Sequence, residues 1–374
     1  MINFAQPHIS SEEIKEVLKV LKSKWLTTGG KNVEFATAIK KYTNTKYCLP
    51  VNSCTSAIHL ALICAEVQSG DEIITTPLTF VSTINTIVNM HASPVFVDIK
   101  PNDFIIDEDR IEEKITKKTK AIVITHYAGY SANLTKLRKI TKRHKIALIE
   151  DAAHAFGSKY NNEYIGENSD YACFSFYPTK NITSAEGGGL VTNKKSIYER
   201  ALILSSNGIT KHASTRYLKE GSWRYDVTEA GFKYNLSDLH AALGLAQLKQ
   251  VKKFQKHREL LFSFYKNHLT AIPQVTLLTG NSYSDPFRHM CVIKTTSTKI
   301  SRDEIIQKLK EKNIICSVHF IPVYKFSYYK YLKIKTRDYP QTEKAFSQCI
   351  SLPFSSTTTL KDATIVVREL KKLT

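Results

Sequence analysis

The stretch KAIVITHYAGYSANLTKLRKITKRHKIALIED, residues 120–151, decides the fold class of this chain. It contains an apolar run at 120–126, a helical pattern at 134–144 and a second apolar run at 145–151. Short runs that are apolar throughout indicate strands buried on both faces. Because a helical segment separates them, we expect neighbouring parallel strands in a sheet covered by helices on both sides.

The same alternation continues on both sides of this stretch. Further strand-type runs are KYCLPV (46–51), DEIITT (71–76), PVFVD (94–98) and YACFSF (171–176). Helical patterns lie at 56–65, 80–89 and 107–115. An N-terminal helix is predicted after a capping box of Ser10 and Glu13, with Ile14, Val17, Leu18 and Leu21 on one face. The chain is therefore predicted to be α/β, with a mostly parallel sheet flanked by helices.

The last third of the chain has a different pattern. A long helical segment at 237–268 precedes strand-like segments at 289–296 and 315–321, with a capped helix from Ser301 between them. A chain of 374 residues also exceeds what one hydrophobic core usually supports. We expect a large domain over residues 1–249 and a smaller α+β domain over residues 250–374, with the boundary inside the long helical segment.

Composition excludes several classes of protein. Hydrophobic residues make up 42% and charged residues 23%, which excludes a mostly disordered chain and a coiled coil. No apolar run approaches the length of a membrane span, and the N-terminus lacks the pattern of a secretion signal, so we expect a cytoplasmic protein with no membrane partner. The seven cysteines are widely spaced without a CxxC pair, so neither a disulfide framework nor a metal site is expected.

The net charge of +19 suggests an anionic partner. The basic residues are scattered, however, and lie beside apolar residues at helical spacing. This arrangement favours a solvated basic surface over a nucleic-acid groove, and no nucleic acid is expected as a partner. A nucleic-acid-binding protein is the alternative from charge alone, and it would show strong salt-dependent binding.

Three groups of polar residues follow the predicted strands, where sheets of this class bind ligands. The loop 52–56 opens a helix whose N–H groups and dipole suit a phosphate, although a helix cap explains it better when taken alone. Asp151 ends the central apolar run and would hold a cationic heterocycle or cap the next turn. Lys180 precedes three glycines at 187–189, which permit close approach of a ligand. Considered without the other two groups, Lys180 would be interpreted as a solvated surface lysine.

Taken together, these groups match the needs of pyridoxal phosphate. That cofactor requires a phosphate anchor, an acid that keeps the pyridine nitrogen protonated, and a lysine amine for a Schiff base. The acid makes the ring an electron sink, and a lysine displaced by an incoming amine can move a proton between carbon atoms. Because the three groups follow strands of one sheet, their combination is far more specific than any one of them.

A series of motifs runs along nearly the whole chain. They are WLTTG (25–29), NSCTS (52–56), TPLTF (76–80), HYAG (126–129), EDAAH (150–154), residues 175–189, GFKYNLSD (231–238) and SVHF (317–320). In the order and spacing of these motifs, the chain resembles the DegT-type nucleotide-sugar aminotransferases, within fold-type I of the pyridoxal phosphate enzymes.

The resemblance implies roles around the cofactor. Lys180 would bind it covalently and shuttle the proton, while Asp151 would pair with the pyridine nitrogen. Phe80 would lie against the ring and His154 near it. The alternatives are that Phe80 is an ordinary core residue and that His154 is a structural histidine held by hydrogen bonds. Thr55, Ser56 and Ser175 would hold the phosphate.

Other matching positions concern the partner subunit and the substrate. Asn235 would reach the phosphate of the partner subunit's cofactor, so the resemblance implies a homodimer with shared active sites. The nucleotide-linked sugar would be bordered by Thr28, Gly29 and His319. The alternative is a purely structural role, as an ordinary loop for Thr28 and Gly29 and as a strand residue for His319.

The resemblance also implies the reaction. Some relatives carry His in place of the lysine and remove a sugar hydroxyl, so Lys180 favours transamination over this lyase reaction. Glutamate would leave its amino group on the cofactor as pyridoxamine phosphate. FIPVYKFSYYK (320–330) and HYAG (126–129) resemble the branch that aminates UDP-linked 4-keto-6-deoxy sugars, giving 4-amino-4,6-dideoxy sugars for lipopolysaccharide or other surface glycans. The alternatives are a 3-keto aminotransferase acting on a dTDP-linked sugar and a non-catalytic regulator that binds the cofactor.

Overall fold

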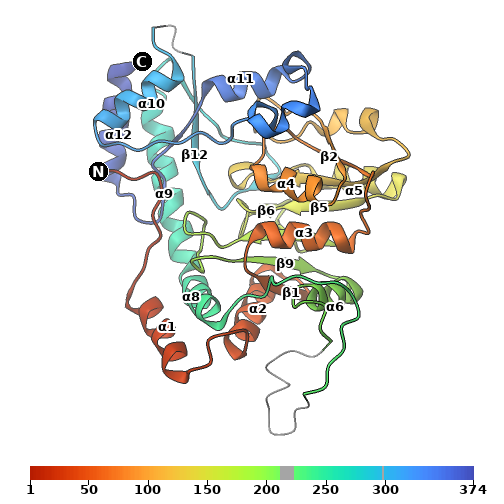
Figure 1. Cartoon of the computed structure of the whole chain (residues 1–374). Coiled ribbons are helices and arrows are strands. Elements are labelled where there is room, and N and C mark those ends of the chain that lie inside the picture. The colour runs from red at the N-terminus through yellow and green to blue at the C-terminus, as the bar shows by residue number, and fades with distance from the viewer. Residues whose placement is uncertain (211–222, 297–298) are drawn as a thin grey trace.

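A seven-stranded sheet dominates the computed structural model, which describes residues 1–210, 223–296 and 299–374 (Figure 1). Its strand order is β1-β9-β8-β5-β4-β2-β3. The strands are β1 (Tyr47–Val51), β2 (Glu72–Thr75), β3 (Ser93–Phe96), β4 (Thr119–Thr125), β5 (Ala147–Asp151), β8 (Tyr171–Ser175) and β9 (Gly188–Thr192). All neighbouring pairs are parallel except those of β9, which is antiparallel to β1 and β8. The predicted α/β class with a mostly parallel sheet is confirmed.

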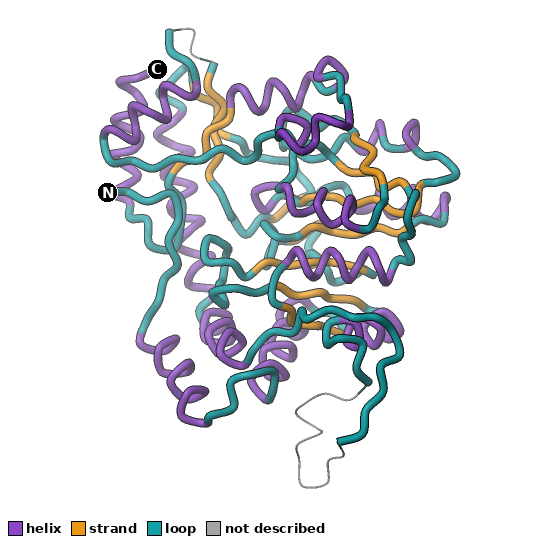
Figure 2. Tube along the Cα trace, viewed as in Figure 1, coloured by secondary structure: helices purple, strands orange, loops and turns teal. Residues whose placement is uncertain are grey.

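Helices surround this sheet (Figure 2), and two smaller three-stranded sheets have the orders β10-β12-β13 and β11-β6-β7. The helices are α1 (Ser11–Ser23), α2 (Gly30–Thr43), α3 (Cys54–Cys64), α4 (Val81–Asn89), α5 (Leu134–His144), α6 (Lys195–Leu204), α8 (Asp238–Lys249), α9 (Val251–Leu269), α10 (Arg302–Glu311), α11 (Pro340–Gln348) and α12 (Leu360–Leu373). The remaining strands are β6 (Lys159–Tyr160), β7 (Glu163–Tyr164), β10 (Val275–Leu277), β11 (Ser284–Asp285), β12 (Cys291–Thr295) and β13 (Cys349–Leu352).

Both faces of the large sheet are buried, as the apolar runs predict. Along β4, Ile122 and Ile124 pack into a core with residues of α2, α5 and α8. Ala121 and Val123 point the other way, into a core with α3, α4 and α6. Side chains of a strand alternate between its faces, so a strand between two helical layers must be apolar at every position.

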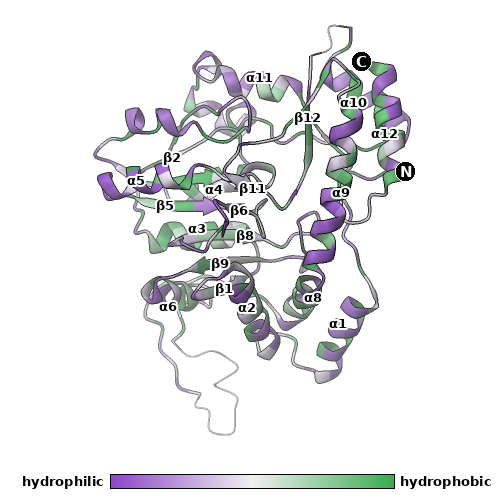
Figure 3. Ribbon diagram, turned by 180° about the vertical axis from the view of Figure 1, so that it is seen from behind, coloured by the Kyte–Doolittle hydropathy of each residue, from purple (hydrophilic) through white to green (hydrophobic). Residues whose placement is uncertain are grey.

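Along β5 the colour changes from green to purple at the carboxyl end, where the polar site residues begin (Figure 3).

The six predicted strand runs all form strands of this sheet, whereas β9 is not among them. Gly188 and Gly189 open β9 and carry no side chains, so they give no apolar pattern. The absence of side chains is what lets β9 lie against neighbouring backbone. A Cβ atom on Gly188 would lie 2.4 Å from the backbone nitrogen of Cys54.

Three other predictions of elements are wrong. The segment 107–115 forms two 3-10 turns, Glu108–Arg110 and Glu112–Lys114, because the buried Glu108 is tied to Lys100 and to the backbone of Asn133. The segment 237–268 is two helices, which meet at Gln250, a residue with non-helical backbone angles. The segment 315–321 forms only an isolated bridge, between Ser317 and Ser351.

Helix α1 has the predicted capping box but an unexpected orientation. Its apolar residues Ile14, Leu18 and Leu21 are 46–54% exposed, whereas Glu13 is fully buried. Glu13 accepts hydrogen bonds from the side chains of Gln247 and Gln250, which fixes the polar side of α1 toward α8. The apolar face of α1 therefore points away from this chain's own core.

The C-terminal part has a core of its own, built by β10, β12 and β13 together with α9, α10 and α12. The N-terminus lies against it, since Ile2 forms a bridge with Ile314. A division into domains 1–249 and 250–374 stays a prediction. Within the described part of the chain, no helix combines the length and apolar character needed to span a membrane.

Gly188→Ala should destabilise the protein by about 1–3 kcal/mol, because the added methyl group collides with backbone at the start of α3. Urea unfolding of the cofactor-free protein measures this loss. Gly30→Ala is the matched control, since a Cβ atom there meets nothing within 4 Å. Equal unfolding midpoints for the two variants would contradict the packing argument.

Candidate active site

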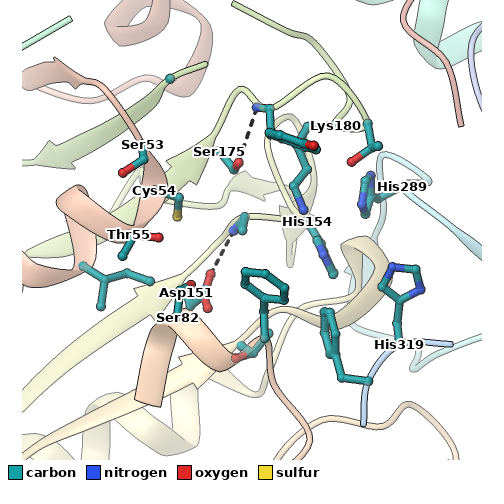
Figure 4. A pocket seen from close by; sticks show the side chains of 18 of the residues that line it. Ser53, Cys54, Thr55, Ser82, Asp151, His154, Ser175, Lys180, His289 and His319 are labelled. Atoms are coloured by element: carbon teal, nitrogen blue, oxygen red, sulfur yellow. Dashed lines mark hydrogen bonds between the residues drawn. The ribbon is translucent and has the colours of Figure 1, made fainter. Parts of the chain in front are cut away.

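A cavity of about 610 Å³ lies at the carboxyl ends of β4, β5 and β8. Thr125, Asp151 and Ser175, the last residues of these strands, line it. The start of α3 forms one wall, and residues 317–320 of the C-terminal part form another (Figure 4). The predicted position of the site, beyond the ends of parallel strands, agrees with this geometry.

Lys180 enters the cavity from the loop after β8. Its backbone N–H donates to the carbonyl of Tyr177, at 2.9 Å, which fixes a turn at the base of the side chain. Burial lowers the pKa of the amine to about 8, against the opposing effects of Cys54 and Asp151. A substantial fraction of the amine is therefore neutral near pH 8, and the neutral form is the nucleophile.

Asp151 is the buried carboxylate of the cavity, at 3% exposed, and the exposed Glu186 is a second carboxylate in its lining. Burial raises the pKa of this carboxyl, while hydrogen bonds from Thr83 and Ala153 and the charge of Lys180 oppose the rise. Thr83 Oγ1 donates to Oδ2 at 2.7 Å, and the N–H of Ala153 donates to Oδ1 at 3.2 Å. A cationic partner stabilises the charged form of a buried carboxylate, and a protonated ring nitrogen would be such a partner.

The helix α3 begins at the cavity with Ser53 as its cap. Ser53, Cys54 and Thr55 line the cavity, and so does Ser175 opposite them. Hydroxyls beside a helix N-terminus suit a phosphate group. Ser56, also predicted to hold the phosphate, does not line the cavity, and its hydroxyl donates to Asn52 Oδ1 at 2.6 Å.

An aromatic wall closes the cavity on the side of His154. The His154 ring stacks on Phe320, with centroids 5.5 Å apart, and Phe80 lies 6.0 Å from Phe320. His154 is 5% exposed, and its buried Nδ1 atom has no hydrogen-bond partner. His319 stacks on Phe4, with centroids 5.3 Å apart, and burial lowers its pKa to about 3.

The motif at 126–129 supports the strand ends. His126 accepts a hydrogen bond from the N–H of Ala132 at Nδ1, so its Nε2–H donates to the buried Glu150, at 2.9 Å. The backbone N–H of His126 donates to the carbonyl of Asp151. His126 thus fixes the carboxyl end of β5 rather than lining the cavity.

Three predicted residues lie apart from the cavity of the single chain. Asn235 Nδ2 donates to Thr28 Oγ1 at 2.7 Å, and the N–H of Gly29 donates to Asp238 at 2.8 Å. These residues form a second cluster at the starts of α2 and α8. None of the three belongs to the cavity lining within the described residues.

Sequence reasoning missed several lining residues, among them Phe4 and His289. Neither follows a strand of the large sheet. His289 precedes β12, and Phe4 lies in the N-terminal segment that bridges to the C-terminal part. No local pattern in the sequence distinguishes these residues from ordinary core residues.

The sequence profile of the DegT/DnrJ/EryC1/StrS aminotransferase family matches residues 7–371. The chain belongs to this family. It is 38% identical to the spore coat polysaccharide biosynthesis protein SpsC of Bacillus subtilis, over 99% of this chain and 96% of that protein. The resemblance found in the sequence motifs is thereby confirmed.

Solved structures of sugar aminotransferases share the fold. The putative sugar aminotransferase Spr1654 of Streptococcus pneumoniae, in its PMP form, superposes with a TM-score of 0.94 at 30% identity, covering 100% of this chain and 99% of that one. PseC of Helicobacter pylori, an aminotransferase of pseudoaminic acid biosynthesis, gives 0.91 at 31% identity, covering 99% and 98%. The protein is a pyridoxal-phosphate-dependent sugar aminotransferase of fold-type I.

The residues of the cavity fit this cofactor, because an acid, an amine and a helix N-terminus with hydroxyls surround one space. When bound, pyridoxal phosphate supplies an electron-withdrawing ring that stabilises negative charge during amino-group transfer. Asp151 would hold the proton on the ring nitrogen, and Thr55 and Ser175 would contact the phosphate. Lys180 Nζ, with its lowered pKa, can accept and release a proton near neutral pH.

Covalent attachment of pyridoxal phosphate to the cofactor-free protein should become faster as the pH rises. Below about pH 8 the rate should increase roughly tenfold per unit, because the fraction of neutral Lys180 amine grows, and above it the rate should level off. Borohydride trapping followed by mass spectrometry measures the rate. Lys180→Ala should form no adduct at the site. Lys194→Ala is the control and should behave as wild type, since Lys194 is exposed. An attachment rate that does not change with pH around 8 would contradict the role of Lys180.

Proposed function

We propose that the enzyme transfers the amino group of glutamate to the 4-keto group of a UDP-linked 4-keto-6-deoxy sugar. The product is a 4-amino-4,6-dideoxy sugar for a surface glycan. The observation that carries the aminotransferase assignment is that Lys180 and Asp151 line one cavity in a member of this family. A cavity of about 610 Å³ is also within the usual range for small-molecule sites.

The choice of sugar is supported by two motifs and by two relatives. The motif at 320–330 starts at the cavity with Phe320, and the hydroxyl of Tyr127, from the motif at 126–129, donates to the carbonyl of His319. Both motifs therefore adjoin the wall that a substrate would contact. PseC acts in pseudoaminic acid biosynthesis and SpsC in spore coat polysaccharide biosynthesis, which favours a glycan precursor as substrate.

A panel of keto-sugar nucleotides tests this substrate. With glutamate as donor, the UDP-linked 4-keto-6-deoxy sugar should give an amino sugar and 2-oxoglutarate, and Lys180→Ala should give neither. Mass spectrometry separates the amino product from a deoxygenated one, so it also tests the lyase alternative. Preferential turnover of a dTDP-linked 3-keto sugar would overturn the proposal in favour of the other aminotransferase.

We also propose that two copies form a dimer and share their active sites. The apolar face of α1, made by Ile14, Leu18 and Leu21, is exposed in the single chain. Apolar groups gathered on one helix face favour a binding partner. A second copy that covers this face would also lie beside the cluster of Thr28 and Asn235, and Asn235 would then contact the phosphate of the partner's cofactor.

Leu18→Asp should weaken the dimer by at least about tenfold in dissociation constant, because the change places a charge in a buried apolar contact. Analytical ultracentrifugation over a range of concentrations measures this change. Leu360→Asp is the matched control, since Leu360 is also exposed, at 50%, but begins α12. Equal dimerisation of both variants would show that the α1 face is not the interface.

A further inference from the structure

His289 is a cavity residue without an assigned task. It is 5% exposed and lines the cavity, and its backbone N–H donates to the carbonyl of Ala128 at 3.3 Å. Its ring lies 4.4 Å from the ring of His154, between centroids. The buried Nδ1 atoms of both rings have no partner in the described structure. Because Nδ1 of His289 is buried, its other ring nitrogen, Nε2, is the one left to face the cavity.

Behind His289 lies Arg258 of α9, which is 1% exposed. Its Nη1 atom donates to the carbonyl of His289 at 2.9 Å and to those of Arg288 and Phe354 at 3.4 Å each. No carboxylate among the described residues forms an ion pair with this guanidinium, and its Nε atom has no partner. A buried charge without a counter-ion is costly. A buried charge of this kind behind a cavity wall is a candidate functional group.

The charges of the cavity are separated. Asp151 lies near Thr83 and Ala153 at one end, whereas His154, His289 and His319 gather at the other (Figure 4). Burial lowers the pKa of His289 well below its usual value, and His154, Lys180, Arg258 and His319 lower it further. This histidine is therefore neutral, and burial lowers the pKa values of His154 and His319 as well. An anion placed here is attracted by the buried charge of Arg258.

The cavity lining of the described residues contains no arginine. It therefore lacks the bidentate guanidinium that most readily holds a carboxylate. Lys180 would be bound to the cofactor. In the described single chain, the imidazole N–H of His289 is then a donor at this end of the cavity, beside the hydroxyl of Ser317.

We propose that His289 binds a carboxylate of the amino donor, and that Arg258 is the residue that positions His289 and makes this end of the cavity electropositive. The proposal rests on the proposed function, since it assigns the donor half of that reaction. One N–H of the neutral imidazole donates to the carboxylate. Arg258 holds the backbone carbonyl of His289, so the ring keeps its place against His154.

Binding of glutarate to the cofactor-loaded enzyme tests this subsite, because glutarate has two carboxylates and no amine to react. Titration calorimetry should show that His289→Phe raises the dissociation constant of glutarate about tenfold or more, while phenylalanine preserves the ring contact with His154. His257→Phe is the matched control, since His257 bonds the carbonyl of Thr358 outside the cavity and should leave the affinity unchanged.

Variants that remove or keep the positive charge of Arg258 test its role in glutarate binding. Arg258→Met should weaken glutarate binding about tenfold, and Arg258→Lys should restore part of the affinity, because lysine keeps the positive charge. Arg302→Met is the control for loss of a buried arginine, since Arg302 also donates to a carbonyl, that of Cys349, but lies away from the cavity. Binding of the uncharged glutaramide should be weak and insensitive to Arg258→Met.

Two results would overturn the proposal. One is an unchanged glutarate affinity in a folded His289→Phe variant that retains the absorbance of bound cofactor. The other is a wild-type enzyme that binds cofactor but binds glutarate no better than glutaramide. Failure of the wild-type enzyme to take up cofactor would instead refute the proposed function, so the two failures are distinguishable.

Discussion

The buried carboxylate of Asp151 and the amine of Lys180 in one cavity are the constraint on which this enzyme depends. Parallel pairing of β5 with β8 brings the two together, since Asp151 lies opposite Cys173 in that register and Lys180 follows shortly after β8. Burial raises the pKa of the acid and lowers that of the amine. The large sheet, its two helical layers and the His126–Glu150 pair serve to keep these groups in place.

The cavity is completed by parts of the chain that do not belong to the large sheet. Phe4, His289, His319 and Phe320 come from the N-terminal segment and from the C-terminal part, and they form the aromatic and histidine wall together with Phe80 and His154. The large sheet thus contributes the residues that fit the cofactor. The C-terminal part contributes His289, His319 and Phe320 to the cavity, and the proposed donor and sugar contacts lie there.

Two features of the single chain lie outside its core and its cavity: the apolar face of α1 and the cluster of Thr28 and Asn235. The apolar face of α1 points to solvent because the buried Glu13 ties the opposite side of the helix to α8. The nearby Asn235 donates to Thr28, the hydroxyl of Thr28 donates to the carbonyl of Leu236, and neither residue lines the cavity of its own chain. Both observations are explained together if a second copy covers this region, as the proposed dimer requires.

The sequence by itself determined the α/β class, six of the seven main strands, and the acid, amine and helix start of the cofactor site. These follow from local rules, because buried strands are apolar at every position and ligands lie where parallel strands end. Only the tertiary structure decided the place of β9, the break at Gln250 and the recruitment of Phe4, His289 and Arg258. Glycines, a helix end and a buried arginine are set by contacts with residues distant in the chain, and such contacts leave no periodic pattern in the sequence.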